Sequence, residues 1–337
     1  MTRYYRPLVQ SGPARPETAL ALAGGPCWFS HVEVLDRTAP PNVMAADALP
    51  DDWRAALTMP RQPIAGLTLD RPRIMGILNV TPDSFSDGGL HDTVPGVLRG
   101  ADAMQAADIL DIGGESTRPG AETVPDAEEI ARVVPAITAL RQAGHRQPIS
   151  IDTRKTAVAH AAIEAGADMV NDVAGFTFDA GLAPLCAHHG LPVCVMHAQG
   201  DPQTMQADPR YDDVLLDVYD WLSDRIAVLV GQGIPRERIV ADPGIGFGKT
   251  LDHNLALIAR LSLFHGLGVP LLLGASRKRF IGTIGKAEAP RDRMPGSIAV
   301  AIAALQHGTQ IVRVHDVAET AQAIALWRAS VAGEAHE

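Results

Sequence analysis

The sequence predicts an α/β protein: a (β/α)8 barrel of the TIM type that follows an N-terminal appendage. A chain of 337 residues is long enough for one such barrel and an appendage, so a second full domain is not required. Apolar residues make up 46% of the chain and aromatic residues only 4%, which favours a layered core of small aliphatic side chains. From residue 74 onward, apolar runs alternate with alanine-rich amphipathic segments, as successive strands and helices do.

Residues 1–65, the expected N-terminal appendage, lack this alternation and contain nine prolines. Within them, Val32 and Val34 alternate with polar residues and predict a short strand, and residues 45–58 predict a helix. No pattern in the appendage predicts a role for it. We expect the barrel to occupy residues 66–332 and a short C-terminal tail to follow at 333–337.

Eight apolar runs, most of them rich in β-branched residues, form the predicted barrel strands. They span residues 74–80, 109–113, 148–152, 169–172, 193–197, 239–242, 271–275 and 311–315. Several intervening helices have clear stop signals, such as Gly144, Gly166 and Gly231. Eight strand and helix units favour a closed barrel over an open doubly wound sheet, which usually has fewer strands and a dinucleotide fingerprint.

The charge and cysteine content exclude several classes of function. The formal net charge is -10, and the only short basic run is 277–279, so we expect neither a nucleic-acid partner nor a membrane surface. The three cysteines fit neither a disulfide framework nor a zinc spacing. The N-terminus lacks a targeting pattern, and no apolar run reaches the roughly 18 residues of a membrane span. These features predict a cytoplasmic protein.

Polar side chains stand at the ends of the predicted strands, where the chemistry of such barrels is found. A single polar residue there is most often a loop cap, but together they form two sets. The first set offers donors and acceptors suited to the edge of a flat heterocycle with amide and guanidine-like groups: Asp152, Asn171, Asp242 and Lys278. The second set suits a metal-bound diphosphate: Asn79, Arg118, Arg313 and His315.

Seven strand-end segments resemble the signatures of dihydropteroate synthases, in the right order over residues 66–332. The segments are 77–89, 111–120, 150–153, 171–173, 242–249, 276–278 and 313–317. This resemblance implies a transferase of folate biosynthesis. Its substrates would be the small molecules dihydropterin methyl diphosphate and 4-aminobenzoate, and its products dihydropteroate and diphosphate. It further implies Mg²⁺ as cofactor and a homodimer formed through the last helices.

The resemblance also implies a role for each matching residue. The pterin would be bound by Asp152, Asn171, Asp242 and Lys278, with Met196 and Phe247 along its faces. Asn79 would be the magnesium ligand, and the diphosphate would contact Asn79, Thr117, Arg118, Arg313 and His315. The aminobenzoate pocket would include Phe85, Thr117 and Pro119, on two loops that close over the site and also carry Asp87 and Arg118.

One departure from the family pattern concerns the aminobenzoate carboxylate. Many members of the family carry Ser after the Ser-Arg-Lys segment, whereas this chain has Arg279. Arg279 either donates a charge-assisted hydrogen bond to the carboxylate or faces solvent, and the sequence favours neither.

The expected chemistry requires a good leaving group more than a base, because an aniline-type amine is already unprotonated near neutral pH. Fixed cations and magnesium would stabilise the departing diphosphate, and Asp152 or Asp242 would stabilise positive charge on the pterin. Asp87 and Arg118 would order the loops that exclude water. We therefore expect four catalytic residues: Asp87, Arg118, Asp152 and Lys278.

Two other functions fit parts of this pattern. A methyltransferase that carries methyltetrahydrofolate in a similar barrel would share the pterin ligands, but it has no need for a diphosphate and magnesium site. A silent barrel that acts through the appendage would be expected to lose loop residues first, whereas residues 79–89 and 115–120 are complete. The glycine-rich segment 244–250 is not a Walker motif, because Pro243 occupies a required glycine position.

Overall fold

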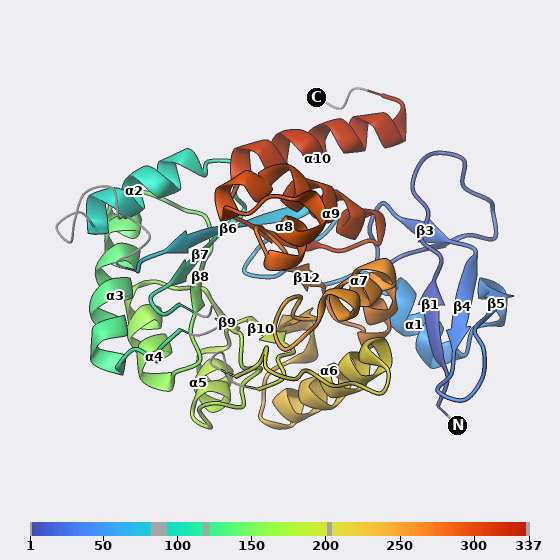
Figure 1. Ribbon diagram of the computed structural model, residues 1–337, viewed down its shortest axis with the longest axis horizontal. Coiled ribbons are helices and arrows are strands. Elements are labelled where there is room, and N and C mark those ends of the chain that lie inside the picture. The colour runs from blue at the N-terminus through green and yellow to red at the C-terminus, as the bar shows by residue number, and fades with distance from the viewer. Residues whose placement is uncertain (1, 82–92, 117–120, 201–203, 335–337) are drawn as a thin grey trace.

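The computed structural model describes residues 2–81, 93–116, 121–200 and 204–334. Its centre is a sheet of eight parallel strands (Figure 1). The strands are β6 (Arg73–Asn79), β7 (Ile109–Gly113), β8 (Ile149–Asp152), β9 (Met169–Asp172), β10 (Val193–Met196), β11 (Ile239–Asp242), β12 (Leu272–Leu273) and β13 (Ile311–Val314). A bridge between Ala241 and Leu271 joins the two ends of the sheet, so the predicted eight-stranded barrel is confirmed.

Helices surround this barrel and follow its strands along the chain (Figure 1). They are α2 (Thr93–Ala103), α3 (Asp126–Gln142), α4 (Thr156–Ala165), α5 (Leu182–His189), α6 (Val214–Gly231), α7 (Leu251–Ala259), α8 (Arg279–Gly285), α9 (Met294–Gln306) and α10 (Val317–Ala332). Left-handed glycines end α4 and α5, as the predicted stop at Gly166 required. None of the helices in the described ranges is both long and apolar enough to cross a bilayer.

Two predicted elements differ from the structure for local reasons. The run 271–275 forms only the two-residue strand β12, and Gly274 then lies between Asp242 and the side chain of Arg313. The predicted helix 45–58 is divided into a 3-10 turn (Ala46–Ala48) and α1 (Asp51–Thr58). Pro50 causes this division, because it disfavours helical backbone at the residue before it.

The N-terminal appendage has a sheet of its own. This antiparallel sheet consists of β1 (Tyr4–Pro7), β4 (His31–Leu35) and β5 (Asn42–Ala45). A separate two-stranded antiparallel ribbon is formed by β2 (Leu20–Ala21) and β3 (Trp28–Phe29). Figure 1 shows this blue region at one side of the barrel, beside α6 and α7. Trp53 of α1 stacks on Tyr219 of α6, with ring centroids 5.7 Å apart. The appendage is thus packed against the barrel through aromatic side chains.

Candidate functional site

The carboxyl ends of the first four barrel strands are aligned in one row. The strand pairing places Asn79 opposite Gly113, Gly113 opposite Asp152, and Asp152 opposite Asn171. Gly113 has no side chain, and a Cβ there would lie 3.5 Å from Asn79 Oδ1 and 3.6 Å from Asp152 Cβ. The glycine therefore keeps open the space between Asn79 and Asp152, two residues of the predicted site.

Asp152 and Arg313 form an ion pair inside the barrel, although the sequence put them in different sets. Arg313 donates from Nη2 to Asp152 Oδ2 at 2.8 Å and from Nε to Asp111 Oδ2 at 2.5 Å. Asn171 Nδ2 also donates to Asp111 Oδ2, at 3.2 Å. Asp111 is fully buried and was not predicted as a site residue. The sequence could have revealed Asp111, because it is a carboxylate in the middle of an apolar strand and such a group is almost never buried without a partner.

One oxygen of Asp152 is left for a ligand. Asp152 Oδ1 is buried and accepts no hydrogen bond within the described part of the chain. Burial raises the pKa of Asp152, the guanidinium of Arg313 opposes this shift, and Asp111 adds to it. An unsatisfied buried acceptor is costly, and Asp111 Oδ1 and Ser150 Oγ share this state, so this part of the barrel has unused hydrogen-bonding capacity.

Asp242, Lys278 and Phe247 form the opposite side of the rim. Asp242 Oδ1 accepts a hydrogen bond from Gly244 N at 2.8 Å, which holds the turn that follows β11. Lys278 Nζ lies 3.9 Å from the centroid of the Phe247 ring and donates to Ile245 O. Burial lowers the pKa of Lys278 to about 7, with the carboxylate of Asp242 opposing the shift. The ammonium of Lys278 is thus a donor that titrates near neutrality.

The remaining described residues of the prediction are near these two groups. Met196 is buried at the end of β10 and pairs in register with Asp242. His315 Nδ1 is 3.0 Å from Ser276 Oγ, which links the end of β13 to the turn before Lys278. Arg279 is exposed at the start of α8. Five predicted residues lie outside the described residues: Phe85, Asp87, Thr117, Arg118 and Pro119.

Two buried groups near the rim were not predicted to belong to the site. Lys249 Nζ lies 2.9 Å from His197 Nδ1 and donates to Phe247 O at 3.0 Å. Burial lowers the pKa of Lys249 and of His197. Both side chains therefore hold the turn 243–249, and the contact of the buried His197 is structural. Lysine is rarely buried, and its position in a glycine-rich apolar segment was the available signal.

Charged residues also hold the segments that flank residues 117–120. Arg154 donates to Glu115 at 2.8 Å and to Thr123 at 3.1 Å. Lys155 pairs with Glu115 at 2.5 Å and with the fully buried Glu129 at 2.7 Å. Arg154 and Lys155, just before α4, therefore bind residues on both sides of the segment 117–120, which contains predicted site residues. The sequence analysis did not predict this role.

The donor set fits magnesium only as a site shared with a substrate. In the described residues, no group of three or more His, Cys, Asp or Glu side chains could hold a metal ion. Asn79 is half-buried and offers one neutral amide oxygen beside the open space at Gly113. Mg²⁺ commonly takes one or two protein ligands and completes its shell with phosphate oxygens and water. Asn79 therefore fits as a single protein ligand to a phosphate-bound ion.

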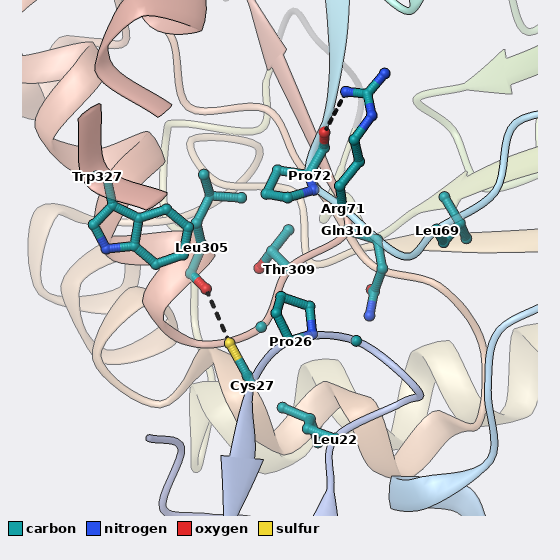
Figure 2. Close-up of a pocket in the computed structure, with 12 residues that line it drawn as sticks. Leu22, Pro26, Cys27, Leu69, Arg71, Pro72, Leu305, Thr309, Gln310 and Trp327 are labelled. Carbon is teal, nitrogen blue, oxygen red and sulfur yellow. Dashed lines mark hydrogen bonds between the residues drawn. The ribbon is translucent and has the colours of Figure 1, made fainter. Parts of the chain in front are cut away.

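A hollow lies at the other end of the barrel, near the amino ends of the strands (Figure 2). It is bordered by the appendage, by residues that precede β6 and β13, and by Trp327 of α10. Arg71, its one charged lining residue, pairs with Asp108 at 2.7 Å. The hollow contains none of the predicted site residues, so the carboxyl ends of the strands remain the candidate site.

Comparisons with known proteins identify the family of the barrel. A family model described as "Pterin binding enzyme" matches residues 75–315. The chain is 44% identical to dihydropteroate synthase of Escherichia coli K12 over 270 residues, which cover 80% of this chain and 95% of the relative. It is 47% identical to dihydropteroate synthase of Synechocystis over 264 residues, 77% of this chain and 91% of the relative.

Solved structures give the same result for the fold. Dihydropteroate synthase of Yersinia pestis in a sulfonamide complex superposes with a TM-score of 0.75 at 45% identity, covering 80% of this chain and 98% of that one. Xanthomonas albilineans dihydropteroate synthase in complex with 7,8-dihydropteroate has a TM-score of 0.72 at 44% identity and the same coverage. The family model begins at residue 75, so the N-terminal appendage lies outside it.

Proposed function

This chain belongs to the family of pterin-binding enzymes, and from that premise we propose which reaction its barrel performs. It is a dihydropteroate synthase: it joins the methylene carbon of dihydropterin methyl diphosphate to the amine of 4-aminobenzoate. The products are 7,8-dihydropteroate and diphosphate. The carbon–oxygen bond to diphosphate breaks, a carbon–nitrogen bond forms, and the amine releases one proton.

The free oxygen of Asp152 is the observation that carries this proposal. A dihydropterin presents adjacent N–H donors along one edge and a carbonyl oxygen beside them. Asp152 Oδ1, the carboxylate of Asp242 and the ammonium of Lys278 are complementary to those groups in charge and in hydrogen-bonding type. Asn171 and Met196, at the ends of β9 and β10, would complete the pocket, with Phe247 along the face of the ring.

We assign the diphosphate to the side of the rim that carries Asn79, Arg313 and His315. Arg313 is bound to two carboxylates, and Asp111 and Asp152 raise its pKa despite burial, so it stays cationic at every working pH. A bound Mg²⁺, held by Asn79, would neutralise charge on the leaving group. Thr117 and Arg118, outside the described residues, are the further diphosphate ligands that we propose.

The aminobenzoate would approach from the loops that follow β6 and β7. Phe85, Thr117 and Pro119 are the proposed lining residues, and all three lie outside the described residues. Arg279 is exposed, which leaves its guanidinium accessible to the carboxylate of the second substrate. Asp87 and Arg118 would order the loops, so that water does not compete with the amine for the activated methylene carbon.

Charge separation is the difficult step, and buried charges prepare for it. As diphosphate leaves, positive charge develops on the pterin, beside the carboxylates of Asp152 and Asp242. Both carboxylates are buried, so their field is weakly screened. Their positions are fixed before the reaction, Asp152 by Arg313 and Asp242 by Gly244 N, which is the arrangement that stabilises a transition state most effectively.

Three further properties are proposals on separate grounds. A homodimer is supported by exposed apolar side chains on the late helices, including Leu326 of α10 and Ile284 of α8. A cytoplasmic location is supported by three buried cysteine thiols without a disulfide. Separate roles for residues 1–65 and 66–332 are supported by the appendage's own apolar core of Phe29, Val32 and Leu57.

The proposed activity is tested by incubating the purified chain with Mg²⁺, dihydropterin methyl diphosphate and 4-aminobenzoate. We expect dihydropteroate and diphosphate to appear in equal amounts, and chelation of Mg²⁺ to stop both. The Asp152→Asn variant keeps the shape of the side chain but removes its charge, and it should form both products more slowly than wild type. Release of diphosphate without dihydropteroate would show hydrolysis in place of synthesis and would contradict the assignment.

A further inference from the structure

The turn 244–248, which lies between Asp242 and Lys278, contains three glycines and an internal hydrogen bond from Phe247 N to Gly244 O at 3.1 Å. Gly244, Gly246 and Gly248 all have positive φ angles, of 69°, 82° and 61°. Three glycines remove the side chains that would otherwise pack the turn against its surroundings. Its geometry therefore depends on hydrogen bonds from neighbouring segments.

Residues 204–213, which precede α6, supply such hydrogen bonds from the outside. Gln206 Nε2 donates to Gly246 O at 2.6 Å, and Tyr211 OH donates to Gly248 O at 2.7 Å. On the inner side, Lys278 donates to Ile245 O. The segment 204–213 and Lys278 thus hold the turn that carries Phe247 together with Asn254 Oδ1 of α7, which accepts from Gly246 N at 2.6 Å, and Lys249 Nζ, which donates to Phe247 O at 3.0 Å.

The end of this segment is fixed in turn by Asp217 in the first turn of α6. Asp217 Oδ2 accepts from the backbone N of Asp212 at 3.0 Å and from that of Asp213 at 3.2 Å. Its other oxygen, Oδ1, accepts from Arg37 Nη1 at 2.7 Å. Arg37 belongs to the N-terminal appendage, and its Nη2 binds Asp220 on the next turn of α6 at 2.8 Å.

Arg37 holds α6 as part of a larger contact. Tyr4 OH donates to both carboxylate oxygens of Asp220 at 2.9 Å, and Trp53 stacks on Tyr219. The appendage therefore packs against one face of the N-terminal end of α6, which follows the segment 204–213. A polar route of described contacts runs from Arg37 through Asp217 to the segment that holds the turn.

From this route we infer that Arg37 is a positioning residue for pterin binding, and that the N-terminal appendage thereby tunes the active site. The inference rests on the proposed function, since it concerns the same pterin pocket. Arg37 fixes the carboxylate of Asp217, Asp217 fixes the start of α6, and the segment before α6 fixes the turn with Phe247. The appendage thus acts on the reaction without touching a substrate.

A second ion pair between the appendage and the barrel offers a matched control. Glu33 binds Arg6 at 2.6 Å and Arg260, which follows α7, at 3.2 Å. It links the same two parts of the chain, but within the described residues Glu33 forms its hydrogen bonds with Arg6 and Arg260 and none with residues 204–213 or the turn 244–248. Glu33→Gln therefore weakens the junction without interrupting the proposed route.

The experiment compares Arg37→Gln, Arg37→Lys and Glu33→Gln in the full chain. Because Arg37 is partly exposed, we expect Arg37→Gln to raise the KM for dihydropterin methyl diphosphate only by roughly two- to fivefold, with kcat almost unchanged. Arg37→Lys should fall between wild type and Arg37→Gln, since lysine keeps the charge but cannot bind both carboxylates. Glu33→Gln should leave KM at the wild-type value, even though its melting temperature falls.

A double-mutant cycle shows whether the effect follows the proposed route. Tyr211→Phe removes the hydrogen bond to Gly248 O, so Arg37→Gln should add little to its effect on KM, whereas Glu33→Gln and Tyr211→Phe should be additive. Direct calorimetric binding of dihydropterin methyl diphosphate gives a readout that is independent of turnover. A wild-type chain that binds this compound without forming product would contradict the proposed function alone. Equal affinities of wild type and Arg37→Gln, or equal losses in Arg37→Gln and Glu33→Gln, would overturn the positioning role.

Discussion

The two ends of the barrel interior differ in polarity and in charge. The lower layer, at the amino ends of the strands, is apolar and fully buried, and its side chains are Met75, Ile109, Met169, Cys194, Val240, Leu272 and Ile311. The upper layer, toward the carboxyl ends, carries the half-buried Arg313 and the buried polar side chains Asp111, Asp152, Asn171 and Asp242. The same strands thus contribute to a dry packed core and to a charged site.

The change from one layer to the other takes place within two residues. Ile109 and Asp111 share β7, and Ile311 and Arg313 share β13. Alternate residues of a strand point to the same face, so each pair faces the barrel interior. We therefore expect the lower layer to contribute most to stability and the upper layer to carry the proposed chemistry, so substitutions in the two layers should separate these properties.

Asp152→Asn should give the largest effect on activity. The substitution removes the carboxylate that faces the developing charge, so kcat/KM should fall on the order of 10²- to 10³-fold. Stability should change little, by about 1 kcal/mol or less, because two carboxylates surround one guanidinium and Asp111 still pairs with Arg313. Steady-state kinetics and urea unfolding measure the two quantities. A large loss of stability with normal kinetics would reverse the assignment of the upper layer.

Ile109→Ala should give the opposite result, two residues away on the same strand. Ile109 is 1% exposed, and its truncation leaves a cavity in the lower layer, so the free energy of unfolding should fall by about 2–5 kcal/mol. At temperatures where the variant stays folded, kcat/KM should match wild type. Ile109→Val, a smaller truncation, should lose only about 0.5–1.5 kcal/mol. A kinetic defect in the folded Ile109→Ala enzyme would mean that the layers are coupled.

The sequence predicted the barrel well because its signals are local. Apolar runs, alanine-rich helices and terminal glycines all act within a few residues, and the eight strands lie where these patterns placed them. The appendage was predicted only in part: the strand expected at Val32 and Val34 is β4, but the other strands were not predicted. Its strands are two to five residues long, and the sheet order β1-β4-β5 pairs segments separated by turns and prolines. The division of the helix at Pro50 was visible in the sequence and was missed.

The candidate site was predicted as a set of residues but not as a set of contacts. Asp111 and Arg313 are separated by 202 positions, and β6 lies between their strands in the sheet. Their contact depends on strand register and on the reach of an arginine side chain, which local patterns do not encode. The same holds for Lys249 with His197, and for Arg37 with Asp217.

Gly244→Ala should lower both stability and pterin affinity, unlike the substitutions within a single layer. A methyl group there would lie 1.8 Å from the backbone oxygen of His197, and the φ angle of 69° is unfavourable for alanine. We expect a loss of about 1–3 kcal/mol in stability. Pterin affinity should fall as well, since Gly244 N holds Asp242. Gly285→Ala, where no atom lies within 4 Å of the added carbon, is the matched control for thermal unfolding and pterin binding.

A smaller effect than that of Asp152→Asn should come from pH, through Lys278. Burial lowers the pKa of its ammonium from 10.5 to about 7, and the protonated form makes the stronger, charge-assisted hydrogen bond to a pterin carbonyl. The contribution of Lys278 to the affinity for a neutral dihydropterin should therefore fall by up to about tenfold between pH 6 and pH 8, whereas deprotonation of Asp152, whose pKa burial raises to about 7, acts in the opposite direction. Calorimetric titrations across this range measure the dependence. Lys278→Met should bind weakly at every pH and should lose the dependence on Lys278.

Stability should respond to the same group with the opposite sign. Between pH 7 and 10.5 the unfolded chain keeps the proton on Lys278 while the folded chain has lost it. Because the unfolded state then binds more protons, stability contributed by this residue rises with pH in that window. Urea unfolding of wild type and Lys278→Met at pH 7 and pH 9 isolates the contribution as a difference of differences. If Lys278→Met removed neither the fall in affinity nor the rise in stability, another group would be titrating, and the upper layer would owe its pH response to its carboxylates.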